Sequence, residues 1–108
     1  MILIADSGAT KTDWCFGTTL HDCQLVHTEG INPFHLTEEK IKQILQESLL
    51  AQLPFPQEEV KAVFFYGAGC TPEKAGKLSG LLAEVFSYAS IQVESDLLGA
   101  ARALCKHQ

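Results

Sequence analysis

Apolar and strand-favouring residues in the first third of the chain predict three short strands. They span residues 2–6, 13–18 and 23–28, and each run is long enough for a strand with at least one buried face. A glycine-containing turn over residues 7–9 follows the first run. Because all the connections are short, we expect the three strands to be antiparallel neighbours.

The hydrophobic period lengthens after residue 36, which predicts helices that alternate with strands. Thr37 is a good N-cap, and Pro54 ends the first helix. The later elements are a buried strand over residues 60–66, a helix opened by Thr71 and Pro72, a strand over residues 90–94 and a helix that starts at Asp96. The predicted apolar faces are Ile41, Ile44, Leu45 and Leu49 on the first helix, and Ala75, Leu78, Leu82, Val85 and Phe86 on the second.

The resulting order, β-β-β-α-β-α-β-α, predicts an α/β fold with one mixed five-stranded sheet. A meander of hairpins followed by two right-handed crossovers brings the last two strands into the same sheet and puts helices on both of its faces. The 108 residues have room for one such domain.

Composition excludes several classes of protein. The chain is 46% hydrophobic and 19% charged, which is typical of a globular domain and not of a disordered one. No apolar run approaches the ~20 residues of a membrane span, and the N-terminus lacks the features of a signal peptide. The net charge of −5 and the scattered basic residues argue against a nucleic-acid surface. A cytoplasmic location is expected.

The four cysteines, Cys15, Cys23, Cys70 and Cys105, form no closely spaced pair. A zinc site or a redox motif therefore has little support. Two disulfides are compatible with the even count, but without a secretion signal we expect free thiols.

The segment DSGATKT (residues 6–12) is the first candidate for chemistry. In α/β sheets, ligands bind beyond the carboxyl ends of the strands, and this turn follows the first strand. Gly8 lets the backbone approach a ligand closely, and successive N–H groups in such a turn can bind an anion. Thr10 and Thr12 would add hydroxyl groups and Lys11 a cation, which together suit a phosphate.

Asp6 could hold a hydrated Mg²⁺ against those phosphates, because this ion prefers carboxylates and keeps several waters. The spacing is not that of a Walker A loop, and a strand follows instead of a helix. A polar hairpin with Asp6 as a turn former is the alternative.

Asp96 stands at the junction of the fifth strand and the third helix. A carboxylate there could take a proton from a substrate hydroxyl, although aspartate is also a favoured N-cap. Gly67, Ala68 and Gly69 follow the fourth strand and could admit a ligand to the backbone, or form a plain turn. Asn32 precedes Pro33, which favours an extended backbone, so that its amide could bind a polyol or an acetamide group or simply belong to a turn.

Four segments in series, DSGATKT, GINPF, FYGAGC with TPEKA, and SDLLGAA, resemble the N-acetylglucosamine kinase-like branch of the sugar kinase, Hsp70 and actin superfamily. This branch is also called the BadF/BadG/BcrA/BcrD ATPase-like family. The resemblance covers essentially the whole chain, and it implies the ribonuclease H-like (actin-like ATPase) half-domain of these proteins. The family motif often has a further glycine where this chain has Ser7 and Ala9.

The resemblance also implies a role for each candidate residue in ATP-dependent phosphorylation of an amino sugar. Asp6 would position Mg²⁺, and Asp96 would activate the 6-hydroxyl of the sugar. The nucleotide phosphates would meet Gly8, Thr10, Lys11 and Thr12, whereas the sugar and the cleft would meet Asn32, Gly67, Ala68 and Gly69.

Members of this family carry a second lobe on the C-terminal side, with a further phosphate loop and the adenosine site. We therefore expect residues 1–108 to be the N-terminal lobe of a two-lobe kinase and to show little turnover alone, because phosphoryl transfer relies on both sides of the cleft. An exposed interlobe face would also favour self-association, so a homodimer is one expectation.

Two other functions remain open at this point. A metal-dependent nuclease on the same half-fold would need a cluster of carboxylates, and the fourth strand ends in Tyr66-Gly67 where an acidic residue is wanted. A non-catalytic module that binds ATP or a sugar would show binding without turnover in an intact two-lobe protein.

Overall fold

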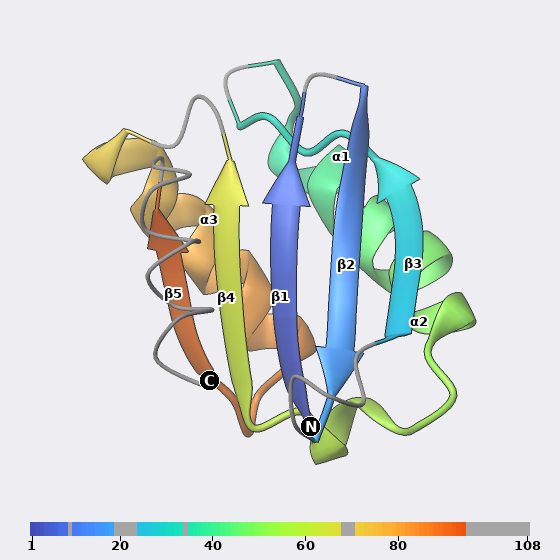
Figure 1. The fold of residues 1–108 in the computed structure, drawn as a ribbon. Helices are drawn as coiled ribbons and strands as arrows, with labels where there is room; N and C mark the ends of the chain where they lie inside the picture. The colour runs from blue at the N-terminus through green and yellow to red at the C-terminus, as the bar shows by residue number, and fades with distance from the viewer. Residues whose placement is uncertain (9, 19–23, 34, 68–70, 95–108) are drawn as a thin grey trace.

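The protein folds around one mixed five-stranded sheet (Figure 1) in the computed structural model, which describes residues 1–8, 10–18, 24–33, 35–67 and 71–94. The strands are β1 (Ile2–Ser7), β2 (Lys11–Gly17), β3 (Gln24–Glu29), β4 (Ala62–Gly67) and β5 (Ser90–Glu94). Their order across the sheet is β3-β2-β1-β4-β5. The first three strands are antiparallel neighbours, and β4 and β5 run parallel to β1. The predicted meander and crossovers are confirmed.

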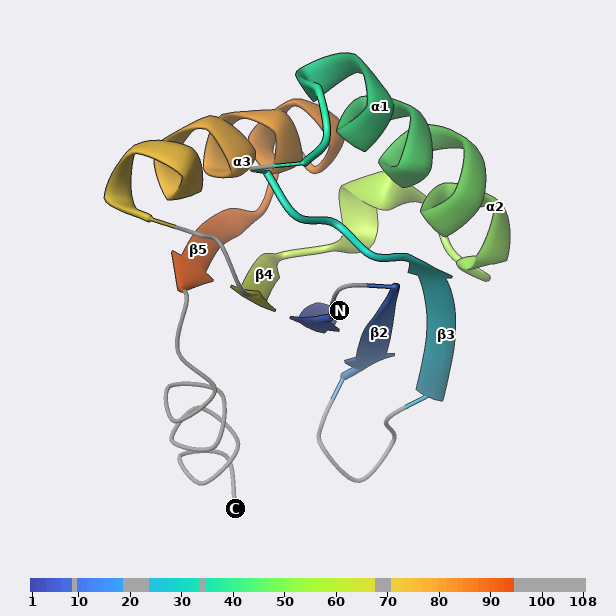
Figure 2. The ribbon, with the colours of Figure 1, turned by 90° about the horizontal axis from the view of Figure 1, so that it is seen from above.

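The helices of the described residues cover one face of the sheet (Figure 2). A continuous helical stretch comprises α1 (Glu38–Gln43), the π-helix η2 (Ile44–Leu49) and α2 (Leu50–Gln52), and the short 3₁₀ helix η3 (Gln57–Glu59) precedes β4. The second long helix is α3 (Pro72–Val85). The Thr37 side chain accepts a hydrogen bond from the Lys40 N–H, and Thr71 accepts one from the Lys74 N–H, so both predicted N-caps are confirmed.

The hydrophobic core lies between the sheet and these helices. Trp14 and Phe65 are fully buried at its centre, with ring centroids 5.9 Å apart. The Trp14 indole N–H donates to the Thr28 hydroxyl at 2.9 Å, so that the large ring is buried without an unpaired polar atom. The predicted helical faces, including Leu45, Leu49, Leu78 and Leu82, are buried against the sheet.

Three details differ from the sequence-based expectations or extend them. The second strand begins at Lys11 rather than Asp13, because a tight turn between Gly8 and Lys11 starts the hairpin earlier. Cys15 is disulfide-bonded, which corrects the expectation of a free thiol there. Helices were expected on both faces of the sheet, whereas those of the described residues cover one face (Figure 2), and the helix expected from Asp96 lies outside the described residues. Among the described helices, none is long and apolar enough to cross a membrane.

Candidate functional site

Three of the predicted ligand-binding segments meet at the carboxyl end of β1. In the sheet register Ser7 is opposite Thr12 of the hairpin on one side and Gly67 of β4 on the other. The Ser7 hydroxyl also contacts both backbone polar groups of Ile31, the residue before Asn32. Three segments therefore lie together at the carboxyl ends of β1 and β4: the hairpin, the residues after β3 and the end of β4. Ala68, Gly69 and Asp96 lie outside the described residues.

The β1–β2 hairpin is closed by a short turn. The Gly8 N–H donates to the Lys11 carbonyl at 2.8 Å, and the Thr10 carbonyl accepts from the Gly30 N–H at 3.1 Å. Gly8 does not adopt a positive φ, and an added Cβ would lie 3.6 Å from the Lys11 carbonyl oxygen, an ordinary contact. The turn itself therefore does not require glycine here, and the Gly8 N–H is already used within the hairpin. The side chains of Thr10 and Lys11 are exposed and available to a ligand.

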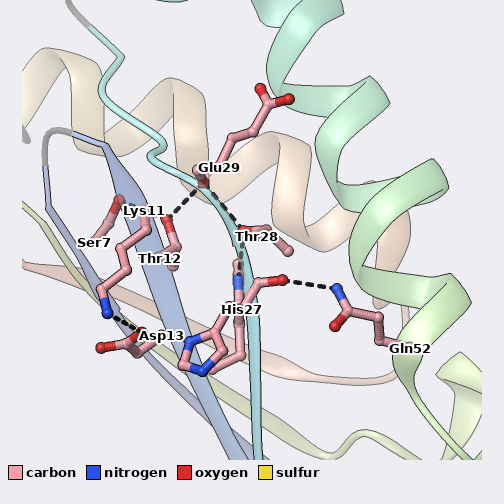
Figure 3. A network of polar contacts seen from close by, with 9 residues as sticks. Ser7, Lys11, Thr12, Asp13, His27, Thr28, Glu29 and Gln52 are labelled. Carbon is pink, nitrogen blue, oxygen red and sulfur yellow. Dashed lines mark hydrogen bonds and ion pairs between the residues drawn. The ribbon is translucent and has the colours of Figure 1, made fainter.

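Hydroxyl groups join the hairpin to the end of β3 (Figure 3). The Ser7 and Thr12 hydroxyl oxygens are 2.8 Å apart, and the Thr12 hydroxyl donates to the Glu29 carbonyl at 3.0 Å. Thr12 is fully buried, so its hydroxyl faces the interior beneath the hairpin. Thr12 therefore holds the hairpin against β3, and its buried hydroxyl is not accessible to a phosphate at the hairpin surface.

Sequence reasoning assigned no role to Ser7, although a signal was present. Residues on one face of a strand recur every second position. Ser7 follows Leu3 and Ala5 at this spacing, and Thr12 precedes Trp14 and Phe16 in the same way. This alternation places both hydroxyl groups on the buried face of the sheet.

The opposite face of the hairpin carries charged side chains. Asp6 is exposed and makes no hydrogen bond or ion pair with the other residues that the structure describes. Asp13, opposite Asp6 in the register, contacts His27 Nδ1 at 2.7 Å and Lys11 Nζ at 3.8 Å through its Oδ1 atom (Figure 3). On this face, the Asp6 carboxylate has no partner among the described residues, and the ammonium group of Lys11 is exposed on the neighbouring strand.

Two further residues continue this row across the parallel strands. Asp6 is opposite Tyr66, which is opposite Glu94. Tyr66 is only 3% exposed. Burial, and then the negative charge of Glu94, raise the pKa of the Tyr66 phenol above its ordinary value. The phenol is therefore protonated at neutral pH.

Gly67 and Asn32 occupy two restricted positions at this edge. An added Cβ on Gly67 would lie 2.9 Å from Phe65 Cε1 and 3.2 Å from Ser7 Cβ, so packing requires glycine there. Asn32 is half-buried, and its carbonyl accepts from the N–H groups of His35 and Leu36, both at 3.0 Å. The predicted turn at this segment is present, which fixes the backbone from which the Asn32 amide extends.

Comparison with known proteins identifies a similar solved structure. No family model matches the chain, and no curated protein matches it. The structure of a protein from Porphyromonas gingivalis, named "Putative N-acetylglucosamine Kinase", matches with a TM-score of 0.85 and 44% sequence identity. The match covers 98% of this chain and 38% of that one, so this chain spans well under half the length of the protein it matches.

This likeness confirms two predictions made from the sequence. The chain has the N-acetylglucosamine kinase-like fold, and its mixed sheet with three antiparallel and two further parallel strands is that of the ribonuclease H-like, actin-like ATPase half-domain. At 44% identity over nearly the whole chain, the likeness extends beyond the fold to the sequence itself.

Proposed function

We propose that this chain is the N-terminal lobe of an ATP-dependent kinase that phosphorylates N-acetylglucosamine, or a related amino sugar, at its 6-hydroxyl. The observation that carries the proposal is the likeness to the Porphyromonas gingivalis protein over almost all of this chain. The convergence of the hairpin, the Asn32 segment and Gly67 at one edge of the sheet supports it, because ligands bind beyond the carboxyl ends of such strands.

The hairpin residues are assigned to the nucleotide. Lys11 and Thr10 are exposed at its tip and would meet the phosphates, with Gly8 leaving room for their approach. The unpaired Asp6 carboxylate suits Mg²⁺, which is commonly held by one or two carboxylates together with waters and substrate phosphates. When bound, that ion would neutralise charge on the transferred phosphoryl group.

The remaining candidates are assigned to the sugar and the proton. Asn32 would hydrogen-bond the sugar, and residues 67–69 would line the cleft. Asp96 would accept the proton of the 6-hydroxyl as that oxygen attacks the γ-phosphorus and ADP leaves. A second lobe would supply the other side of the cleft, and the protein would act in the cytoplasm.

A nuclease on the same half-fold is less well supported. Within the described ranges, no group of three or more His, Cys, Asp or Glu side chains is placed to share a metal ion, whereas two-metal nucleases need a carboxylate cluster. The end of β4 carries Tyr66 and Gly67 at the position where such a cluster needs an acid.

The test is sugar-dependent release of ADP by the protein expressed from the complete reading frame that contains this chain. N-acetylglucosamine is compared with glucose and with no sugar, and Lys11→Ala is compared with Lys61→Ala. Both lysines are exposed, but Lys61 precedes β4 at the other end of the sheet. Removing the hairpin cation should lower kcat/KM for ATP by about 100-fold, and Lys61→Ala should leave it unchanged. Equal activity of the two variants, or no dependence on an amino sugar, would refute the proposal.

A further inference from the structure

We propose that Ser7 is a positioning residue that couples the nucleotide side of this site to its sugar side. The inference rests on the proposed kinase function and deepens it. The Ser7 hydroxyl links Thr12, which follows the hairpin tip in β2, to the backbone of Ile31 immediately before Asn32. Binding of nucleotide at the hairpin would therefore favour the geometry that binds the sugar, and the reverse.

The contacts of Ser7 are specific and buried. Its side chain is 5% exposed. Its Oγ atom accepts from the Ile31 N–H at 2.9 Å, and lies 3.1 Å from the Ile31 carbonyl oxygen and 2.8 Å from Thr12 Oγ1. On its other side, Ser7 Cβ is the atom that an added Cβ on Gly67 would approach to 3.2 Å. The Ser7 hydroxyl thus contacts the hairpin and the segment before Asn32, and Ser7 is the neighbour of Gly67 in the sheet register.

The number of hydroxyl protons limits these hydrogen bonds. The Thr12 hydroxyl has one proton, and the Glu29 carbonyl accepts from it. The Ser7 hydroxyl also has one proton, and two acceptors lie within its reach: Thr12 Oγ1 at 2.8 Å and the Ile31 carbonyl at 3.1 Å. The contacts therefore connect Ile31 through the Ser7 and Thr12 hydroxyl groups to the Glu29 carbonyl (Figure 3 shows the last link).

A second chain ends on the same carbonyl oxygen. The Trp14 indole N–H donates to Thr28, and the Thr28 hydroxyl donates to Glu29 at 3.1 Å. A carbonyl oxygen has two lone pairs, and these two hydroxyl groups occupy both. No buried side-chain nitrogen or oxygen of the described residues lacks a partner.

Within the part of the chain that the structure describes, Ser7 is the residue whose side chain bonds to Ile31, next to Asn32. Other bonds also join the hairpin to this segment, but they end at Gly30 and Glu29. Ile31 is 1% exposed, so without Ser7 its N–H would be buried without an acceptor. Ser7 is also flanked in the chain by Asp6 and Gly8, so a shift of its backbone moves the proposed metal carboxylate and the phosphate turn together.

The test compares Ser7→Ala with Thr28→Val. Both variants remove one buried hydroxyl that leads to the Glu29 carbonyl. Among the described residues, the Thr28 hydroxyl bonds to Trp14 and Glu29, and neither is assigned to a ligand. Ser7→Cys keeps a weak donor and acceptor and should lie between the wild type and Ser7→Ala. It also carries the test if the alanine variant does not fold.

Two measurements separate the contact from the coupling. Amide hydrogen exchange of Ile31, measured on the present chain, should accelerate in Ser7→Ala and stay unchanged in Thr28→Val. In the protein from the complete reading frame, the affinity for N-acetylglucosamine is measured with and without a non-hydrolysable ATP analogue. The ratio of the two affinities should fall about fivefold in Ser7→Ala, as expected for one lost hydrogen bond, and should be unchanged in Thr28→Val.

The outcomes are distinguishable. Faster exchange of Ile31 with an unchanged affinity ratio would overturn the coupling and leave the kinase function standing. An equal fall of the ratio in Thr28→Val would show a general loss of stability, and would overturn the special role of Ser7. If the wild-type protein neither binds nor phosphorylates an amino sugar, the proposed function fails, and the coupling fails with it.

Discussion

Gly67 shows how a single residue at this edge is restricted by its neighbours rather than by its backbone angles. An added Cβ would meet Phe65 Cε1 at 2.9 Å and Ser7 Cβ at 3.2 Å. We expect Gly67→Ala to lower the free energy of unfolding by about 1–3 kcal/mol, because a well-packed interior must shift to accept even one methyl group.

Gly76 and Gly80 provide matched controls on the exposed side of α3, where an added Cβ meets nothing within 4 Å. Alanine at either position should raise the free energy of unfolding by about 0.5–1 kcal/mol through its helix propensity. Urea denaturation of the three variants measures both effects. A Gly67→Ala protein as stable as the wild type would contradict the packing argument.

Tyr66 predicts a pH dependence of stability. Its pKa in the folded protein is raised above 10.0 by burial and by Glu94, so the unfolded state loses the phenolic proton first as the pH rises. Below pH 10 the phenol is protonated in both states, so its titration does not reduce the free energy of unfolding. That free energy should fall as the pH rises through the pKa of Tyr66 in the folded protein.

Lysines also titrate at high pH, and both Tyr66→Phe and Tyr88→Phe retain all of them. A difference between the two variants therefore reports the titration of Tyr66. Tyr88 is 67% exposed. Denaturation curves between pH 8 and pH 11 should show a shallower decline for Tyr66→Phe than for the wild type, and an unaltered decline for Tyr88→Phe. Parallel curves for all three proteins would show that Tyr66 does not titrate differently in the folded state.

At the scale of elements, the hydrophobic pattern predicted most of the fold. The capping residues Thr37 and Thr71 marked the starts of two helices. Runs of alternating apolar residues marked the strands. Both signals are local in the sequence. The π-helix over residues 44–49 was not predicted, since its buried side chains fit an α-helical face equally well. The hydrogen bonds between Ser7 and Ile31, which is 24 positions away, were not predicted because they arise only in the folded chain.

The end of α2 is tied to the edge strand β3 by one side chain. Gln52 Nε2 donates to the His27 carbonyl at 2.8 Å and to the Ser48 carbonyl at 3.1 Å (Figure 3 shows the contact with His27). We expect Gln52→Glu to lower the free energy of unfolding by about 1 kcal/mol, because a carboxylate cannot donate to either carbonyl. Gln52→Lys, which retains a donor, should cost less. Thermal unfolding of both variants measures the difference, and equal losses would show that the hydrogen bonds contribute little.

At the scale of the whole molecule, the proposed function assigns the described residues to one side of a phosphoryl-transfer site. In the hairpin, Asp6 offers a carboxylate that no other described residue pairs with, and Lys11 offers an exposed ammonium group. Phosphoryl transfer depends on positioning and on charge stabilisation around the whole transferred group. The solved kinase-like protein is more than twice as long as the segment it shares with this chain, which leaves room for a second set of such groups.

We therefore expect residues 1–108 alone to release no ADP in an N-acetylglucosamine-dependent manner, while still binding Mg²⁺-ADP weakly at the hairpin. A coupled assay measures turnover, and changes in the amide chemical shifts of residues 8–11 on addition of Mg²⁺-ADP report binding. Lys11→Ala should abolish these changes, and Lys61→Ala should retain them. Weak binding without turnover is the result of a correctly folded but incomplete site, because the hairpin geometry is fixed by contacts within this chain. Sustained sugar-dependent release of ADP by these residues alone would mean that the groups at this edge suffice for the reaction, and the two-lobe interpretation would then be wrong.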